Sequence, residues 1–428
     1  MQIFKFGGAS IKNAEAVKRA ADIIKNHYRD HLLVVFSAMG KTTNALENVC
    51  ATCKSNREAG LQLFKGIINE HIEICSRLFE SNDPVFQAVK SIEKEISIIL
   101  TDKPTADFSY FYDQVVPAGE LLSTTILSRY LKMTGCENEW FDARKLIKTD
   151  YRFTKATVDQ TKTTLQINSK LKPYFQSPIR LAVTQGFISG ADPLNPTTLG
   201  REGSDYSAAL FAYFLDAESV TIWKDVKGVL NADPKYFQNT RLLKNISYRE
   251  AIELAYYGAS IIHPKTIQPL QEKKIPLYVK SFNKPENEGS VIDENTAEDD
   301  AVPSFIFKKN RRLISISPAD FSFVAETGLS RIFELLGKYA ITVDIMQNSA
   351  INFSICVDDQ HPNIEKLTEA LKKEYRILYN SELELLTVRH YDQATIHELT
   401  RDKNVVLEQR TRNTTRMLLS NHAPAGNL

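Results

Sequence analysis

The sequence predicts an α/β protein that begins with a parallel-rich sheet covered by helices and continues with units in which strands and helices follow a different order. Short apolar runs alternate with helical patterns from the N-terminus, at residues 3–6, 14–28 and 32–36. Strands separated by helices are typical of a parallel sheet with helices on both faces. A polar, acidic segment at residues 283–303 cannot bury much surface, and a new pattern begins after it. This segment predicts a domain boundary.

The first domain is expected to span residues 1–290. Three further apolar runs, at residues 179–183, 219–223 and 276–279, are predicted strands, and a long helix-rich stretch at residues 43–100 precedes them. A chain of 428 residues is long enough for two or three domains, and this one has room for a sizeable core.

The part after the boundary has the order strand, helix, strand, strand, helix, strand, which is a ferredoxin-like signature. The predicted elements are residues 313–317, 329–339, 341–347, 351–357, 363–374 and 375–378. A shorter second copy has its elements at residues 383–388, 393–401, 404–409 and 415–419. It lacks a final helix and strand, so either residues 304–307 complete it or it is minimal. We predict domains at residues 304–380 and 381–421.

The charge balance and the apolar pattern exclude several classes of protein. Lys and Arg number 53 and Asp and Glu number 52, so the net charge of +1 offers no basic surface for nucleic acid or anionic membranes. The N-terminus resembles no signal peptide, and no run approaches the roughly 18 apolar residues of a membrane span. We therefore expect a cytoplasmic protein that binds a small soluble ligand.

The five cysteines do not form a disulfide framework or a metal site. They are odd in number and spread thinly along the chain. Cys50 and Cys53 form a C-x-x-C, but no second Cys or His pair stands at zinc-ligand spacing, and the pair falls in a helical pattern. We interpret them as reduced structural thiols and predict no protein metal site.

Two segments near the N-terminus combine glycines with hydroxyl and lysine side chains. They lie at the ends of predicted strands, where open α/β sheets bind ligands. In residues 5–10, the pair Gly7 and Gly8 lets the backbone approach phosphate oxygens, and Lys5 supplies a positive charge. The alternative is an ordinary tight turn. Residues 37–44 imitate the end of a P-loop, but the first glycine of that motif would fall at Val35, inside a strand. That second segment is better suited to holding a polar ligand.

Two later segments have the same character. Residues 197–205 run into a predicted helix at residues 206–215, so Ser204 and Asp205 could simply be N-caps. Arg201 favours a ligand site, because a guanidinium beside glycines can bind a carboxylate in a bidentate manner. Residues 223–235 follow a strand and are rich in Asp, Gly and Lys, although such a turn is commonly a solvated loop.

Taken together, these segments resemble the aspartate kinase family through all 428 positions. Residues 5–11, Lys-Phe-Gly-Gly-Ala-Ser-Ile, are similar to the family's Lys-Phe-Gly-Gly-Thr-Ser-Val. Residues 197–205, Thr-Thr-Leu-Gly-Arg-Glu-Gly-Ser-Asp, differ from its signature at one position, and residues 117–123, 257–264 and 343–349 also have counterparts. The resemblance implies an amino-acid kinase fold followed by tandem ACT domains. It also implies transfer of the ATP γ-phosphoryl group, with Mg²⁺, to the β-carboxylate of L-aspartate, the first step of lysine, threonine and methionine biosynthesis.

The resemblance assigns roles to individual residues. Lys5 would neutralise the transferring phosphoryl group, and Asp205 would order the positive groups around it. Arg201 would meet the α-carboxylate of aspartate and Glu120 its ammonium. The residues expected to bind aspartate are Ser37, Thr43, Glu120, Arg201 and Ser204. The residues expected to border the nucleotide are Lys5, Gly7, Gly8, Ser10, Lys224, Asp225, Leu230, Lys235, Ser260 and Ile261.

The chain departs from the family pattern in the kinase motifs. Glu202 replaces a glycine and adds negative charge near an anionic substrate, so we expect it to point outward or to meet a cation. Lys224 stands where many relatives have threonine, and Ser260 stands where several have lysine. The positive charge that those relatives carry at the position of Ser260 would then be supplied by Lys224.

The C-terminal domains are expected to bind an amino-acid effector, with Asp344 and Ser349 as the candidate residues. Ala350 stands where the family has a glutamate that would help hold an ammonium, which puts lysine feedback in doubt. Lysine, threonine, another effector and no control all stay open. ACT modules commonly pair edge to edge, so the resemblance implies at least a homodimer.

Two other classes of function stay open beside aspartate phosphorylation. One is a non-catalytic amino-acid sensor, which the intact Lys5, Glu120, Arg201 and Asp205 disfavour. The other is a related kinase acting on acetylglutamate or carbamate, which the C-terminal domains and the Arg201 motif disfavour. An aspartate carboxylate, with a reference pKa of about 3.9, is already ionised at neutral pH and needs no general base, so a site rich in Lys and Gly suits it.

Overall fold

A computed structural model describes residues 1–28, 30–102, 107–176, 178, 180–259, 262–318 and 326–420. The chain divides into two compact units. The first comprises Met1–Val229, Leu242–Ile252 and Ser260–Asp299, and the second comprises Leu230–Arg241, Glu253–Ala259 and Asp300–Leu428. Two short segments before residue 260 thus group with the C-terminal part.

The first unit is built on an eight-stranded sheet with β1 (Gln2–Phe6) near its centre. The strand order is β3-β4-β2-β1-β7-β9-β10-β8, and every neighbouring pair is parallel except β9 and β10. The other strands are β2 (Leu32–Phe36), β3 (Asn138–Phe141), β4 (Leu181–Gln185), β7 (Ser219–Lys224), β8 (Asn245–Ser247), β9 (Leu277–Ser281) and β10 (Ser290–Asp293). The parallel-rich sheet predicted from the sequence is therefore confirmed.

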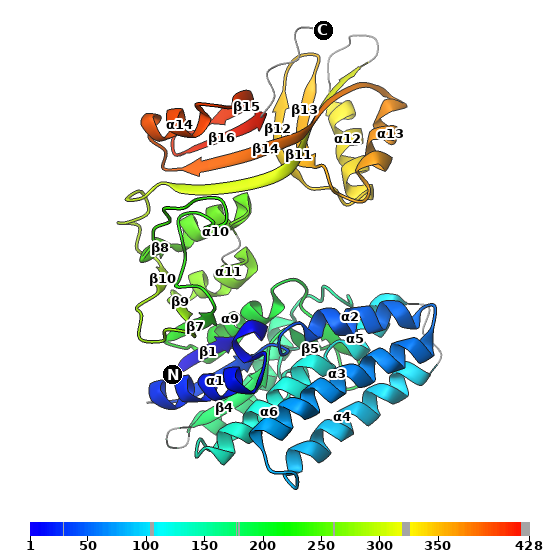
Figure 1. The fold of residues 1–428 in the computed structure, drawn as a ribbon, viewed down its shortest axis with the longest axis vertical. Coiled ribbons are helices and arrows are strands. Elements are labelled where there is room, and N and C mark those ends of the chain that lie inside the picture. The colour runs from blue at the N-terminus through cyan, green and yellow to red at the C-terminus, as the bar shows by residue number, and fades with distance from the viewer. Residues whose placement is uncertain are drawn as a thin grey trace. The chain divides into compact units, whose positions relative to one another are not determined.

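Both faces of this sheet are covered, as strand β2 illustrates. All five of its residues are buried, with Leu32, Val34 and Phe36 in one hydrophobic cluster and Leu33 and Val35 in another. The first cluster includes the long helices, which lie side by side in Figure 1. These are α1 (Ala14–His27), α2 (Thr42–Cys53), α3 (Arg57–Leu78), α4 (Pro84–Thr101), α5 (Phe108–Val115) and α6 (Ala118–Met133). The second cluster includes α9 (Gly203–Leu215) and α11 (Pro264–Glu272).

The cysteines lie in the interior of the protein. Cys50 and Cys53 lie on α2, and all five cysteines are buried and unpaired. Burial raises the pKa of Cys50 to about 12, so its thiol stays protonated at neutral pH. No described helix is long and apolar enough to span a bilayer.

The second unit contains a six-stranded antiparallel sheet of order β12-β13-β11-β14-β16-β15. Its elements are β11 (Ser304–Pro318), α12 (Glu326–Lys338), β12 (Val343–Asn348), β13 (Phe353–Asp358), α13 (Ile364–Lys372), β14 (Tyr375–Arg389), α14 (Gln393–Thr400), β15 (Asn404–Arg410) and β16 (Thr414–Ser420). Within this unit, α10 (Tyr248–Tyr257) contributes its last turn.

Strands β11 and β14 are long and lie side by side at the centre of this sheet (Figure 1). The sequence predicted separate short strands at residues 375–378 and 383–388 of β14 and at residues 313–317 of β11, with residues 304–307 as a further candidate beyond the polar stretch 308–311. That prediction was wrong: an irregularity between Lys308 and Leu313 absorbs the polar stretch, with Asn310 in the left-handed region at φ 54°, and the strand continues. Ser304 to Lys308 pair with the last residues of β14, so residues 304–307 supply the strand that the short second copy lacks.

Candidate active site

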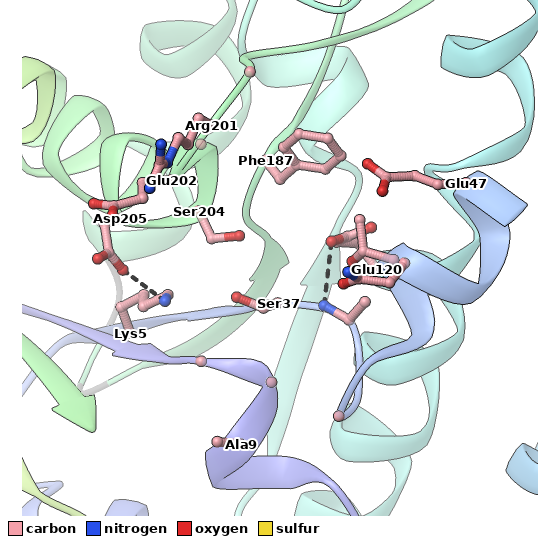
Figure 2. Close-up of a pocket in the computed structure, with 18 of the residues that line it drawn as sticks. Lys5, Ala9, Ser37, Glu47, Glu120, Phe187, Arg201, Glu202, Ser204 and Asp205 are labelled. Carbon is pink, nitrogen blue, oxygen red and sulfur yellow. Dashed lines mark hydrogen bonds and ion pairs between the residues drawn. The ribbon is translucent and has the colours of Figure 1, made fainter. Parts of the chain in front are cut away.

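A pocket of about 1020 Å³ opens in the first unit where the parallel strands β1, β2 and β7 end. This is the edge at which open α/β sheets bind ligands. In Figure 2, Lys5 and Asp205 lie on one side of the pocket, Glu120 and Glu47 lie on the other, and Ser37 and Ser204 lie between them. The pocket brings together the predicted residues Lys5, Gly7, Gly8, Ser10, Ser37, Thr43, Glu120, Arg201, Ser204, Asp205, Lys224 and Asp225.

One side of the pocket is a buried cluster of charges. The Nζ of Lys5, on β1, lies 2.6 Å from Oδ1 of Asp205, and these side chains are 9% and 5% exposed. The Nζ of Lys224, at the end of β7, lies 3.5 Å from Oδ2. Burial raises the pKa of Asp205, but Lys5 and Lys224 outweigh it and hold the pKa below its ordinary value. Asp205 is thus an anion that positions two cations.

The turn after β1 packs tightly against the turn after β2. A Cβ on Gly8 would lie 2.6 Å from the carbonyl oxygen of Gly40, so only glycine fits there, and the Gly40 amide donates to the Gly8 carbonyl at 3.0 Å. The hydroxyl of Ser10, in the 3₁₀ helix η1 (Gly8–Ile11), donates to the carbonyl of Trp223 at 3.0 Å. Ser10 therefore ties the β1 turn to the end of β7, beside the lysines.

Glu120 has a buried carboxylate with one oxygen unsatisfied. It stands in the first turn of α6 and is 2% exposed. Its Oε1 accepts the amide of Ala38 at 3.2 Å, whereas Oε2 has no hydrogen-bond partner among the described residues. Burial raises the pKa of Glu120 to about 8. A cationic group entering the pocket would supply the missing partner and favour the ionised form.

Helix α9 begins at Gly203, earlier than predicted. Ser204 and Asp205 lie inside its first turn and do not cap it, so the capping alternative was wrong. The residue before the helix, Glu202, adopts φ 54°, the left-handed region that glycine tolerates best. Its side chain lines the pocket, and Oε2 is buried without a hydrogen-bond partner among the described residues. Glu202 forms no ion pair among the described residues, and because the residue is only half-buried, the expectation that it points outward stays a prediction.

Buried Asp113 on α5 holds the loop that carries Arg201. Its Oδ2 accepts the amides of Thr154 and Thr198 at 2.8 and 3.1 Å, and its Oδ1 accepts the Thr198 hydroxyl at 2.7 Å. Burial raises the pKa of Asp113 to about 6, against the effect of these bonds. Thr198 ends β6 (Pro196–Thr198), three residues before the exposed Arg201. Asp113 thus anchors two segments that line the pocket.

Several lining residues were not predicted from the sequence. Glu47 lies four residues after Thr43 on α2 and accepts the Tyr112 hydroxyl at 2.7 Å. Helical spacing from Thr43 could have identified Glu47. Thr154 and Lys155 come from irregular chain, and no local pattern marks them.

Four of the residues that were expected to bind the nucleotide are not found among the residues that line this pocket. Leu230 and Lys235 belong to a segment that groups with the second unit, and they are not among the lining residues. Ser260 and Ile261 lie outside the described residues. All four assignments stay predictions.

In the second unit, the candidate effector residue Asp344 already has cationic partners. Its Oδ1 lies 2.7 Å from Nζ of Lys308, and its Oδ2 lies 3.3 Å from Nε of Arg311. Ser349 is exposed after the end of β12, where its amide and hydroxyl both donate to the carbonyl of Asn352. An effector ammonium would therefore have to compete with Lys308 for Asp344.

Comparisons with known proteins match this chain to kinases by sequence and by fold. Residues 1–281 match the amino acid kinase family. The chain is 29% identical over 359 residues to the lysine-sensitive aspartokinase 3 of Escherichia coli, covering 83% of this chain and 78% of that protein. It spans less than half of the bifunctional aspartokinase/homoserine dehydrogenases of Arabidopsis thaliana and Buchnera aphidicola, 42% and 47% of their lengths.

Two solved structures are similar over nearly the whole chain. The E. coli aspartokinase III in complex with lysine and aspartate, in its T-state, superposes with a TM-score of 0.83. The complex with aspartate and ADP, in its R-state, superposes with a TM-score of 0.80. In each case the identity is 25%, and the match covers 98% of this chain and 96% of the other.

Proposed function

Because the chain belongs to the amino acid kinase family, we propose that it is an aspartate kinase, which transfers the γ-phosphoryl group of ATP to the β-carboxylate of L-aspartate. The proposal is supported by relatives that are aspartokinases and by a similar structure that holds aspartate and ADP. The two alternatives, a non-catalytic sensor and a kinase for another acid, are carried into the test below.

The observation that carries the proposal is the separation of charge within one pocket. Lys5 and Lys224 concentrate positive charge at the strand ends, and Glu120 presents an unsatisfied buried oxygen on the other side. A substrate with an ammonium at one end and a carboxylate at the other would satisfy Glu120 and direct its carboxylate toward the lysines. Arg201 and Ser204 line the pocket where the α-carboxylate would lie.

The residues present suit an attack by one anion on another. An oxygen of the aspartate β-carboxylate forms a bond to the γ-phosphorus, and the bond from that phosphorus to the β,γ-bridging oxygen breaks, so that ADP leaves. Lys5 stabilises the charge on the transferring group, and Asp205 keeps Lys5 and Lys224 in place for it. Gly7 and Gly8 line the pocket, and a glycine turn can bring backbone amides close to phosphate oxygens.

The pocket also fits a magnesium ion that is held mainly by the nucleotide. The described residues contain no group of three or more His, Cys, Asp or Glu side chains arranged to hold a metal. Mg²⁺ in kinases commonly needs only one or two carboxylates together with phosphate oxygens, and Asp205 and the unsatisfied Glu202 both line the pocket. A bound Mg²⁺ would neutralise charge on the phosphates.

The remaining assignments follow from the same proposal. Residues 1–290 would form the catalytic domain, and residues 304–380 and 381–421 the two ACT domains, the second completed by the start of β11. An amino-acid effector, a homodimer or larger assembly through these domains, and a cytoplasmic location stay predictions. The lysine bound to the E. coli enzyme makes lysine the first effector to try.

An acyl-phosphate assay tests the proposal. The full chain is incubated with Mg-ATP and hydroxylamine, which traps the acyl phosphate as a hydroxamate, with aspartate, acetylglutamate or glutamate as acceptor. We expect hydroxamate and ADP with aspartate only. ADP release matched by hydroxamate from acetylglutamate would replace the proposed substrate, and no product from any acceptor would favour a sensor.

A further inference from the structure

A second pocket, of about 700 Å³, lies in the first unit and shares no lining residue with the catalytic pocket. One wall is formed by α7 (Ala143–Leu146) and the segment that follows it. Other lining residues come from α8 (Gln160–Gln166), from the π-helix η2 (Ile167–Leu171), and from the turn between β5 (Ile188–Gly190) and β6. Nothing in the proposed kinase reaction uses this cavity.

Positive side chains predominate in the lining of this pocket. Five of its residues are cationic, namely Arg144, Lys145, Lys148, Lys162 and Lys170. Three are acidic, namely Glu95, Asp142 and Asp192. The chain as a whole is almost neutral, with a net charge of +1, so this local excess is not a reflection of composition.

Two of the three acidic groups are already engaged within the protein. Asp142 caps α7 and forms a bidentate pair with Arg144, whose Nε and Nη2 donate at 2.9 and 2.8 Å. Asp192 accepts the amides of Leu194 and Asn195 and the hydroxyl of Tyr151. The side-chain amide of Asn195 also donates to Oδ2, at 2.7 Å, and this bond together with the others lowers the pKa of Asp192 to about 2. Both carboxylates keep their negative charge, so with the exposed Glu95 three acidic groups face five cationic ones and the lining keeps a net charge of +2.

Three lysines keep donors available to a ligand. No ion pair of Lys145, Lys148 or Lys170 is recorded in the part of the chain that the structure describes. The half-buried Lys148 donates to the carbonyl of Arg144 at 3.1 Å, and an ammonium has three hydrogens to donate. Burial lowers the pKa of Lys148, and the charge of Lys170 lowers it further. A bound anion would relieve this repulsion.

We propose that this cavity, which we call the lysine pocket, binds a small polyanion carrying a phosphate or several carboxylate groups, held by Lys145, Lys148 and Lys170. Lysine ammonium groups are compact point charges, which suits multiply charged anions that need no planar partner. The site does not depend on the proposed kinase activity, because none of its residues lines the catalytic pocket.

The test is isothermal titration calorimetry of the full chain at constant ionic strength, with pyrophosphate and citrate as separate probes. The wild type is compared with the double variant Lys148→Ala/Lys170→Ala and with a matched control, Lys65→Ala/Lys90→Ala, which removes two exposed lysines from α3 and α4. Lys5 and Lys224 of the catalytic pocket would also attract pyrophosphate, so the lysine pocket is reported by the difference between the variants.

We expect the double variant to bind at least one probe about tenfold more weakly than the wild type, equivalent to about 1.4 kcal/mol, while the control is unchanged. The probe that loses affinity identifies the class of polyanion. The single variant Lys170→Glu changes an exposed residue and should weaken binding even if the double variant folds poorly. Identical isotherms for the wild type, Lys148→Ala/Lys170→Ala and Lys170→Glu with both probes would overturn the proposal.

Discussion

Glu120 in the first unit and Asp344 in the second are both acidic side chains suited to an amino-acid ammonium, but their surroundings differ. Glu120 is buried with Oε2 unsatisfied, whereas both oxygens of Asp344 lie beside cations of the same unit, Lys308 and Arg311. A carboxylate that lacks a partner gains one when a ligand binds, but one already paired must first exchange its partner. Glu120 can therefore gain a partner when a cationic group enters, whereas a cation at Asp344 would have to displace Lys308 or Arg311.

The largest effect is expected when the paired carboxylate of the catalytic pocket, Asp205, loses its partner Lys5. If this loss left the reaction rate unchanged, the comparison between paired and unpaired carboxylates would fail. Lys5→Met removes the cation that lies 2.6 Å from Asp205 and that, in the proposed reaction, stabilises the transferring phosphoryl group. We expect the rate of hydroxamate formation to fall by at least about 10²–10³-fold. The control Lys18→Met changes an exposed lysine of α1 and should keep the wild-type rate. A Lys5→Met enzyme with near-normal turnover would contradict the assignment.

Glu120→Gln tests the member of the comparison that has an unsatisfied oxygen. The amide keeps the shape of the side chain but cannot supply a negative charge to the ammonium. The KM for aspartate should rise by about 10–100-fold, since hydrogen bonds to a charged group contribute about 1.5–3 kcal/mol. The KM for ATP should change little. An equal rise in both constants would point to general misfolding of the pocket.

The same substitution has an effect on stability that depends on pH. The folded pKa of Glu120, about 8, lies above its ordinary value of 4.5. Its contribution to the stability of the ligand-free fold is therefore fully present below pH 4.5 and is lost as the pH rises through about 8. Urea unfolding should show Glu120→Gln gaining stability relative to the wild type between pH 6 and pH 9. A constant difference between the two proteins would be inconsistent with this pKa.

Lys308→Met tests the other member of the comparison. Removing the ammonium 2.7 Å from Asp344 leaves Oδ1 open to an effector. If Asp344 belongs to an effector site, inhibition by lysine or threonine should become stronger, by about tenfold for a gain of about 1.4 kcal/mol. Lys309→Met, at the exposed neighbouring position, is the matched control. Unchanged inhibition in Lys308→Met would remove Asp344 from the effector site.

The smallest effect is expected at Glu202, the other unsatisfied carboxylate of the pocket. Glu202→Gly relieves a left-handed backbone conformation, with a gain of about 0.5–1 kcal/mol in the free energy of unfolding after the greater freedom of the unfolded chain is counted. Glu202→Gln removes only the charge and should leave this strain in place. Thermal unfolding and the KM for aspartate of the two variants separate strain from charge.

The fold and much of the site could be predicted because both depend on local patterns. Apolar runs predicted β1, β2 and β7, and the glycine-rich segments 5–10 and 197–205 predicted Lys5, Arg201 and Asp205 as residues of one site. The continuity of β11 could not be predicted, because an irregularity in strand pairing hides it. Asp113 and Lys155 were missed because their positions depend on contacts between distant segments.

The sequence also could not show whether a charged side chain already has an ion-pair or hydrogen-bond partner. Glu120 and Asp344 were assigned by the same resemblance, and only the structure distinguishes an oxygen that lacks a partner from oxygens that have two cations. Glu202 illustrates the same point, since only the structure shows that its Oε2 is buried without a hydrogen-bond partner among the described residues.

The most direct test of this account is the dissociation constant of aspartate, measured by calorimetry at pH 6 and pH 8.5 for the wild type and for Glu120→Gln. A protonated Glu120 must lose its proton before it can pair with an ammonium, so wild-type affinity should strengthen as the pH rises toward about 8. Glu120→Gln should bind weakly at both pH values. Equal affinities in the two proteins, or the same pH dependence in both, would contradict the claim that Glu120 receives the ammonium of the substrate.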